Sequence, residues 1–195
     1  MSLLDYNWLF IKEQVRFLRI SNVYDVYDQN QNKIGAVKEK TNFLKKLLGK
    51  YTLEFYDKDD RLLFTAKKPF AFIKKKVFIY DSNSQLLGHF YKKIIALIPQ
   101  FLIFSREGQQ IGLLKGDFFA WNFQIEDMQK KRIALINKIF SGALREFFTT
   151  ADSYQIMIYE PKAIDKRLLI AAPFVVDIIM KEEQGRKGGF RFRGM

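Results

Sequence analysis

Residues that support cross-linking and metal chemistry are scarce in this chain. It contains no cysteine, which excludes disulfide bonds and every cysteine-based metal or redox site, and which fits a reducing compartment. His89 is the only histidine. One histidine without cysteine cannot form a usual zinc site, and no serine, histidine and aspartate set can be argued from the spacing. We therefore expect no cofactor, no metal and no enzymatic activity, and we expect His89 to be an ordinary strand residue.

Long apolar runs are also lacking. The longest are residues 94–104, which Pro99 and Gln100 interrupt, and residues 168–180. A helix of the second length reaches about 20 Å, against roughly 30 Å of bilayer hydrocarbon, so no membrane-spanning helix is expected. Residues 1–8 lack a positive region followed by a long apolar stretch, so no secretory signal is expected either. These absences favour a cytoplasmic protein, peripheral at a membrane at most.

Aromatic and aliphatic side chains are abundant, and they occur in a short unit that recurs. Of the 195 residues, 48% are hydrophobic and 16% aromatic, which suits one domain with a sizeable core. The unit is an aromatic-rich strand, an acidic or amide turn and a return strand, first seen at residues 23–37. It recurs around residues 53–57, 77–81 and 101–104. Loops rich in Asp, Asn, Ser, Gly or Lys follow these strands and suit tight turns.

The pattern predicts about twelve short strands between residues 8 and 159, among them residues 17–20 and 70–74. Their spacing of roughly 8–12 residues favours a barrel or a sandwich. Residues 41–50 break the pattern, because their apolar positions are spaced as in a short amphipathic helix. We expect that helix to cover one end of the barrel, or to lie on a membrane surface.

The segment from Leu168 to Met180 is apolar on every side except at Asp177. It exceeds an ordinary strand in length, and Asp165 is placed to cap a helix, although Pro173 should kink it. A helix that is apolar all round must be buried on all sides, which only a surrounding barrel offers in a chain of this size. We therefore predict a β-rich fold of the α+β class: a closed antiparallel barrel of about twelve strands around a buried helix over residues 165–180. Residues 1–180 form this domain, and residues 181–195 are predicted to be a flexible basic tail.

The chain carries 33 lysines and arginines against 21 acidic residues, a net charge of +12. Such a protein is attracted to polyanions: an anionic membrane surface, nucleic acid or an acidic partner. The alternative is that the lysines only solubilise strand edges and loops. If the loops at one barrel end converge, their basic residues would form a cationic rim for phosphate head groups. The candidate anion-binding residues are Lys67, Lys68, Lys74, Lys75, Lys76, Lys92, Lys93, Lys130, Lys131 and Arg132.

Acidic residues in the predicted turns offer a second kind of site. Asp28, Asn30 and Asn32 imitate the start of a calcium-binding loop, with Glu39 as its end. However, Lys33 stands where the sharp turn of such a loop needs glycine, and the flanking helices are absent. We predict that Asp28, like Asp57 and Asp81, forms a turn.

Several segments together resemble the phospholipid scramblase and LURP-one-related proteins, which share the tubby C-terminal domain fold. They are residues 24–28 with Ile34 and Gly35, residues 132–138, residues 153–158, Asp165, and the apolar helix with Asp177 near its end. The resemblance covers roughly residues 8–180 and implies a closed barrel of about twelve strands around a central C-terminal helix. It also implies phosphoinositide binding, as in tubby domains, or calcium-responsive lipid movement, as in scramblases.

Two departures from that family pattern bear on calcium-driven scrambling. The acidic calcium segment that scramblases carry before the helix corresponds to residues 160–165, which hold too few carboxylates, and the cysteines used for lipid attachment are missing. We therefore predict a monomeric, non-enzymatic intracellular module that associates with anionic phospholipid surfaces or with a protein partner. The alternatives are a scramblase-like lipid mover and a nucleic-acid-binding protein that uses the basic tail, although no sequence signal of a nucleic-acid-binding fold is present.

Overall fold

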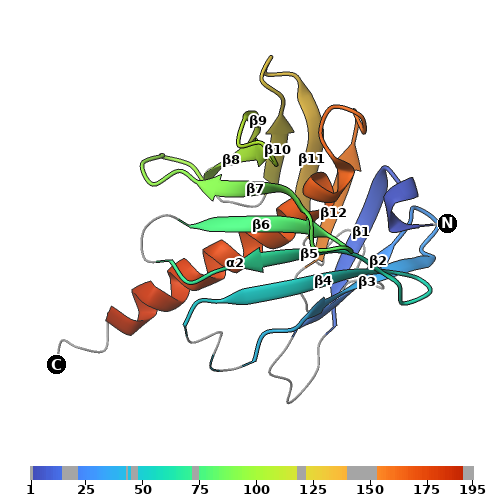
Figure 1. Cartoon of the computed structure of the whole chain (residues 1–195), viewed down its shortest axis with the longest axis horizontal. Helices are drawn as coiled ribbons and strands as arrows, with labels where there is room; N and C mark the ends of the chain where they lie inside the picture. The colour runs from blue at the N-terminus through green and yellow to red at the C-terminus, as the bar shows by residue number, and fades with distance from the viewer. Residues whose placement is uncertain are drawn as a thin grey trace.

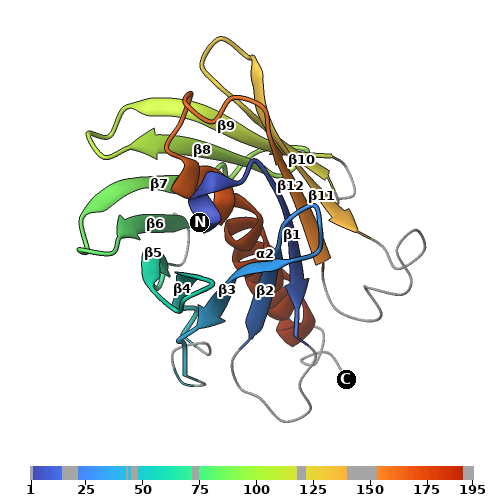
Figure 2. The same ribbon diagram turned by 90° about the vertical axis from the view of Figure 1, so that its right-hand side faces the viewer.

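A closed antiparallel barrel surrounds one long helix (Figures 1 and 2). The structure is a computed structural model, and it describes residues 2–14, 22–42, 44, 48–71, 75–117, 122–139 and 153–190. Within these residues, twelve strands follow each other around the barrel in chain order, and β1 closes it against β12. The strands are β1 (Trp8–Glu13), β2 (Val23–Tyr27), β3 (Lys33–Glu39), β4 (Tyr51–Asp57), β5 (Leu62–Lys68), β6 (Lys76–Asp81), β7 (Leu86–Lys92), β8 (Gln100–Ser105), β9 (Gln110–Gly116), β10 (Asn122–Glu126), β11 (Arg132–Ile139) and β12 (Ser153–Ile158). A short 3-10 helix, η1 (Leu3–Asp5), precedes them, and α2 (Lys166–Phe190) follows.

The recurring sequence unit corresponds to a recurring turn. The carboxylate of Asp28 accepts hydrogen bonds from the backbone N–H groups two and four residues later, each at 2.9 Å. Asp57, Asp81 and Asp127 do the same in their own turns. In the remaining turn, between β8 and β9, Ser105 takes this position. The predicted turn-forming role of the aspartates is therefore confirmed.

The two ends of the barrel differ because the strands run alternately up and down. The five tight turns, which follow β2, β4, β6, β8 and β10, lie at one end, which we call the turn end. The connections that follow β1, β3, β5, β7, β9 and β11 lie at the opposite end. The helix begins beneath the turn end and emerges at this opposite end, which we call the helix-exit end (Figure 1).

The predicted central helix is confirmed. Its residues from Leu168 to Val176 are buried, as are Ile178 and Ile179, and they join the inward side chains of the strands in one core. Phe174 packs edge-on against Tyr24 and Phe55. The side chain of Asp165 accepts a hydrogen bond from the N–H of Arg167 at 2.9 Å, as expected of a helix cap.

Close approach between strand and helix requires glycine at two positions. A Cβ atom on Gly88 would lie 2.3 Å from the carbonyl oxygen of Phe104 and 3.2 Å from a methyl group of Leu168. A Cβ atom on Gly112 would lie 2.8 Å from a methyl group of Ile164. The first turn of α2, and Ile164 just before it, therefore fit only against strands that lack a side chain there.

Some predicted boundaries need correction. The helix continues to Phe190 instead of ending at 180, and Glu182 is buried, so the predicted flexible tail does not start at residue 181. Phe70 and Ala71 are not part of a strand, in contrast to the predicted strand over 70–74. The predicted strand at 17–20, most of the predicted helix at 41–50, and residues 191–195 lie outside the described residues.

Candidate functional site

The ten basic residues predicted to bind anions do not converge on one surface. Lys130, Lys131 and Arg132 lie in the β10–β11 turn and at the start of β11, at the turn end. Lys74 lies outside the described residues. The other six lie where β5, β6 and β7 meet the helix-exit end: Lys67, Lys68, Lys75, Lys76, Lys92 and Lys93.

Three of these six lysines point into the barrel. Lys68 follows the buried Phe64 and Ala66 at a spacing of two, and Lys75 precedes Val77 and Ile79 in the same way. Lys92 likewise follows the buried Phe90. Because side chains alternate between the two faces of a strand, all three fall on the inward face, where the core ends and the helix leaves the barrel.

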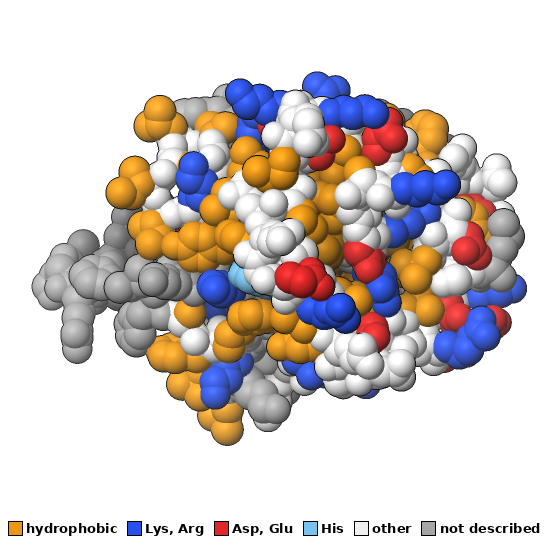
Figure 3. Space-filling model, turned by 45° about the horizontal axis from the view of Figure 1, so that its top comes forward, with side chains coloured by type: hydrophobic (Ala, Val, Ile, Leu, Met, Phe, Trp, Pro, Cys, Tyr) orange, Lys and Arg blue, Asp and Glu red, His pale blue; other side chains and the backbone are white. Residues whose placement is uncertain are grey.

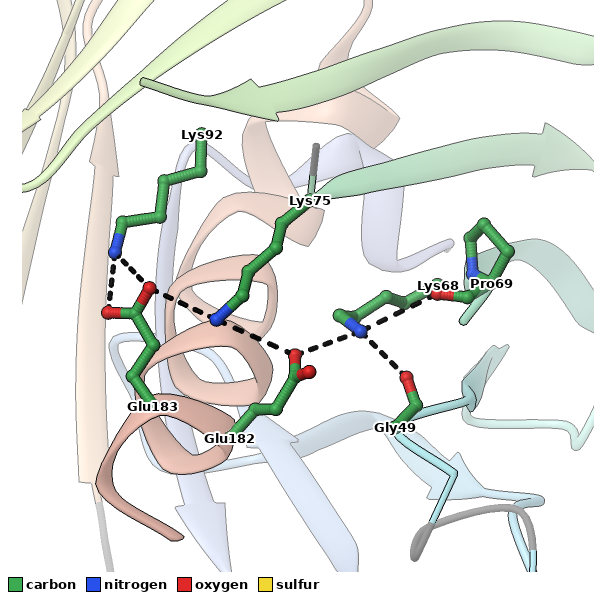
Figure 4. A network of polar contacts seen from close by, with 7 residues as sticks. All are labelled: Gly49, Lys68, Pro69, Lys75, Lys92, Glu182 and Glu183. Atoms are coloured by element: carbon green, nitrogen blue, oxygen red, sulfur yellow. Dashed lines mark hydrogen bonds and ion pairs between the residues drawn. The ribbon is translucent and has the colours of Figure 1, made fainter. Parts of the chain in front are cut away.

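The inward lysines bind two glutamates of α2 (Figure 4). Nζ of the fully buried Lys68 lies 2.9 Å from Oε2 of Glu182 and donates to the carbonyl oxygen of Gly49 at 2.7 Å. Nζ of Lys75 lies 3.0 Å from Oε1 of Glu183 and 3.8 Å from Oε2 of Glu182. Lys92 donates to both carboxylate oxygens of Glu183. We call these five charged side chains the exit network.

The exit network stabilises the fold at the point where the helix emerges. Burial raises the pKa of Glu183, but hydrogen bonds from Lys92 and Lys75 outweigh it and hold that pKa below its ordinary value. A buried charge without its partner is strongly destabilising, so each of these lysines depends on the helix, and the helix on them. Lys68, Lys75 and Lys92 are therefore engaged inside the protein by the two glutamates of α2.

Sequence reasoning missed Glu182 and Glu183, which it assigned to a solvated tail. Two signals were present. The glutamates follow the buried Ile178 and Ile179 by one helical turn, so they continue the inward face of the helix. Lys68, Lys75 and Lys92 also share the inward alternation of their strands, which requires an internal counter-charge.

The outward lysines of the same strands are exposed to different degrees. Lys67 lies on the outer face with its Nζ 5.1 Å from the centroid of the Tyr80 ring. Lys93 and Lys50 are exposed, and Lys76 is half-buried. At the turn end, Lys131 pairs with Glu160 at 2.6 Å, and this hydrogen bond raises the pKa of Lys131. Lys130 has a positive φ of 63° and so serves the geometry of its turn.

The segments that connect the strands differ in charge between the two ends. At the helix-exit end, the described residues of these segments include four lysines, of which Lys75 is buried in the exit network, and one acidic residue, Asp117. At the turn end they contain five basic and five acidic residues. The described residues counted are 14, 22, 40–42, 44, 48–50, 69–71, 75, 93–99 and 117 at the helix-exit end, and 28–32, 58–61, 82–85, 106–109 and 127–131 at the turn end. The excess positive charge of the connections is therefore at the end where α2 emerges.

Large apolar side chains are also exposed at the helix-exit end, next to basic ones (Figure 3). They come from three neighbouring connections: Leu44 and Leu48, Phe70, and Ile94, Ile95 and Leu97. The exposed large apolar residues described elsewhere are Trp8, Met128 and Tyr159. Apolar exposure thus accompanies positive charge at the helix-exit end.

A second polar contact lies deeper, along the helix. Asp177, the polar residue within the apolar segment, accepts hydrogen bonds from the hydroxyl groups of Tyr24 at 3.2 Å and Tyr154 at 3.3 Å. Burial, and then the charge of Asp177, raise the pKa of Tyr24 well above its ordinary value, so its hydroxyl stays protonated. This contact orients the helix within the barrel.

His89 lies between two aromatic rings on neighbouring strands. Its ring stacks on Phe104 at a centroid distance of 4.8 Å and lies 5.3 Å from the ring of Phe78. Burial, and then the charge of Lys76, lower its pKa. Among the residues that the structure describes, no group of three or more His, Cys, Asp or Glu side chains is arranged to hold a metal ion.

Comparison with known proteins identifies relatives over most of the chain. A family model described as Scramblase matches residues 7–183. The Altered inheritance rate of mitochondria protein 25 of Saccharomyces cerevisiae is 20% identical over 202 residues, and the match covers 84% of this chain and 62% of that relative. The chain thus spans less than two thirds of the length of this curated relative.

The fold is also found among solved structures. An X-ray structure of an Arabidopsis thaliana protein matches with a TM-score of 0.58 and 13% identity, over 88% of this chain and 91% of that one. The predicted resemblance and its barrel fold are confirmed. In the described part of the chain, no helix combines the length and the apolar character that crossing a bilayer requires.

Proposed function

Because the chain belongs to the Scramblase family, we propose that it is a non-enzymatic module that associates with anionic phospholipid surfaces through its helix-exit end. Membership of the family indicates a lipid-related or membrane-associated role. The observation that supports the finer proposal is the charge of the described connection residues, with four lysines and one acidic residue at one end and equal numbers of basic and acidic residues at the other.

This asymmetry supports binding with a defined orientation. Each basic residue near an anionic membrane surface contributes about 1 kcal/mol, and the attraction decays within a Debye length of about 8 Å at physiological ionic strength. Charges at the turn end are too far from a surface that the helix-exit end touches to contribute much. Lys68, Lys75 and Lys92 are satisfied by Glu182 and Glu183, so exposed residues such as Lys50, Lys67 and Lys93 are the ones we assign to head groups.

Flotation of the protein with vesicles tests this proposal. We expect binding to vesicles of phosphatidylcholine with phosphatidylserine, little binding to phosphatidylcholine alone, and a steep loss with rising salt. Replacing Lys50, Lys67 and Lys93 with Gln should lower partitioning up to about a hundredfold at low salt. The matched control replaces Lys130, Lys131 and Arg132 with Gln, which removes the same charge from the turn end and should change little.

Three outcomes contradict the proposal. Equal losses in both triple variants would show that binding depends on net charge without orientation. Equal binding to neutral and anionic vesicles would exclude head-group charge as the determinant. A gel-shift assay in which RNA binds while both vesicle types fail would favour the nucleic-acid alternative.

Lipid movement between leaflets is a second candidate, and the family match over residues 7–183 favours it. Vesicles that carry a fluorescent lipid in both leaflets, quenched from outside by dithionite, measure it directly. Quenching that stops at the outer leaflet in the presence of bound protein would exclude this activity under those conditions.

A further inference from the structure

The connection between β7 and β8 is apolar where a surface loop is ordinarily polar. Its residues 94–97 read Ile-Ile-Ala-Leu, and we call them the apolar tip. Ile94 is 60% exposed, Ile95 is 91% exposed, and Leu97 is fully exposed. Removing such aliphatic side chains from water is favourable, so three exposed ones together provide a driving force for binding to an apolar phase.

Single exposed apolar residues are common, but this group is contiguous and has neighbours. Phe70 and the pair Leu44 and Leu48 are exposed in the two preceding connections at the same end. Strands β3 to β8 are consecutive in the barrel wall, so these connections occupy one sector of its rim. The apolar tip therefore forms one edge of a larger exposed apolar sector.

The base of the loop is firmly held, although its tip touches little. Backbone hydrogen bonds join the N–H of Lys93 to the oxygen of Gln100 at 2.9 Å, and the N–H of Lys92 to the oxygen of Lys75 at 3.1 Å. The side chain of Lys92 binds Glu183, so the exit network braces the strand from which the loop extends. The tip is thus presented outward from a fixed base.

We propose that the apolar tip inserts into the interfacial region of an anionic bilayer, with Lys93 at its base among the phosphate head groups. This inference rests on the proposed function and adds to it which residues enter the bilayer and how deeply they do so. Side chains that project into solvent suit a fluid hydrocarbon phase, and basic residues beside them suit the anionic surface. Segments of this kind reach about 5–10 Å into the boundary between head groups and acyl chains.

The absence of cysteine allows a specific test on the full chain. In Leu97→Cys, an environment-sensitive nitrobenzoxadiazole probe labels only the tip. The control is Met128→Cys, which labels an exposed apolar position at the turn end. With anionic vesicles, we expect a blue-shifted emission and quenching by acyl-chain nitroxide lipids for the probe at residue 97, and neither for the probe at residue 128.

A second variant tests the energetic contribution. Ile95→Asp with Leu97→Asp should lower partitioning into anionic vesicles at least about tenfold, because apolar burial is lost and like charge is added. The melting temperature should be unchanged, because both side chains are exposed. The same double variant is also compared with the unchanged protein in solution without lipid. Analytical ultracentrifugation then measures whether the tip mediates self-association.

The outcomes separate this inference from the proposed function. If the unlabelled protein floats with anionic vesicles but the probe at residue 97 reports water as the probe at residue 128 does, insertion is excluded and surface association stands. If no vesicle binds the protein, both fail. If the protein dimerises without lipid and the Asp pair abolishes dimerisation but not flotation, the tip is a contact between copies of this chain, and insertion is excluded.

Discussion

The two ends of the barrel are formed by the same strands, but their connections differ in length, in regularity and in chemistry. At the turn end, five connections of four or five residues repeat one geometry, and four of them use an aspartate at the same position. At the helix-exit end, the six connections range from five to thirteen residues, and three of them expose large apolar side chains. Repetition at one end fixes the register of the hairpins, which leaves the other end free to vary in length and chemistry.

The helix links the two ends, and its removal should have the largest effect. A chain cut after Ile164 loses the apolar segment that fills the barrel, so we expect no cooperative folding. Circular dichroism during heating measures this. Ala172→Asp places an unpaired charge at a buried position and should destabilise the full chain by several kcal/mol, roughly 3–5.

A truncated chain that melts as cooperatively as the full chain would contradict the barrel-around-helix architecture. An Ala172→Asp protein of unchanged stability would show that the site is open to water. Either result would remove the helix as the link between the ends.

The same type of ion pair should be worth far more at the helix-exit end than at the turn end. Glu182→Ala leaves Lys68 buried without its carboxylate and should lower the free energy of unfolding by about 3–5 kcal/mol. The matched control, Glu160→Ala, breaks the exposed pair with Lys131 and should change the free energy of unfolding little, because water screens the pair. Urea denaturation measures both.

Similar losses in the two variants would mean that the exit network is as solvated as a surface pair. A further variant distinguishes charge from packing. Lys68→Met combined with Glu182→Leu removes both charges, and it should be far more stable than Glu182→Ala alone.

The enclosed helix and the exit network also show how much of the fold can be predicted from the sequence alone. The barrel and its helix were predictable, because an apolar segment without a polar face has to be enclosed and the strands alternate with a period of two. The exit network was not identified, because Glu183 pairs with Lys75 and Lys92, which are 108 and 91 residues away. Gly185, Gly188 and Gly189 also disfavour a helix, so tertiary contacts at Glu182 and Glu183 must outweigh local propensity.

The candidate site was predictable only in part for a related reason. Composition identifies the basic residues, but it does not say that Lys67 faces solvent while the adjacent Lys68 is fully buried. Composition also does not show that Lys130, Lys131 and Arg132 lie at the opposite end of the barrel from the other basic residues, since their position depends on the direction of each strand. The apolar tip lies within residues 94–104, a run in which sequence reasoning predicted a strand at 101–104 but assigned no role to residues 94–97.

Acid should weaken the turn end in a way that one turn reports. Burial acts to raise the pKa of Asp57. Hydrogen bonds from the backbone N–H groups of Arg61 and Asp59 and from the side chain of Arg61 outweigh this effect and hold the pKa below its ordinary value of 3.8. Its stabilisation is therefore fully present above the unfolded pKa and is lost as the pH falls through the lower folded pKa. Asp57→Asn should cost about 1–2 kcal/mol at pH 7 and less in acid, at the lowest pH at which both proteins still fold. Denaturation of both proteins at the two pH values measures the difference, and an equal cost at both would exclude the charge of Asp57 as the cause.

The smallest effect compares two glycines with the same backbone conformation, one at each end. Gly108 at the turn end has a φ of +82°, and nothing lies within 4 Å of the position of its absent Cβ. Gly49 at the helix-exit end has a φ of +66°, and its Cβ would lie 3.1 Å from Oε1 of Glu182 and 3.7 Å from Nζ of Lys68. Gly108→Ala should cost about 1 kcal/mol, from backbone strain alone. Gly49→Ala should cost more, because the added methyl group also crowds the exit network.

A substitution in the reverse direction provides the control for backbone strain. Ser84 occupies the position of Gly108 in a neighbouring turn with a φ of 62°, so Ser84→Gly should be neutral or stabilise by up to about 1 kcal/mol. Urea denaturation with unchanged slopes measures all three variants. Equal costs for Gly49→Ala and Gly108→Ala would show that Glu182 yields readily, and the exit network would then be less rigid than its distances indicate.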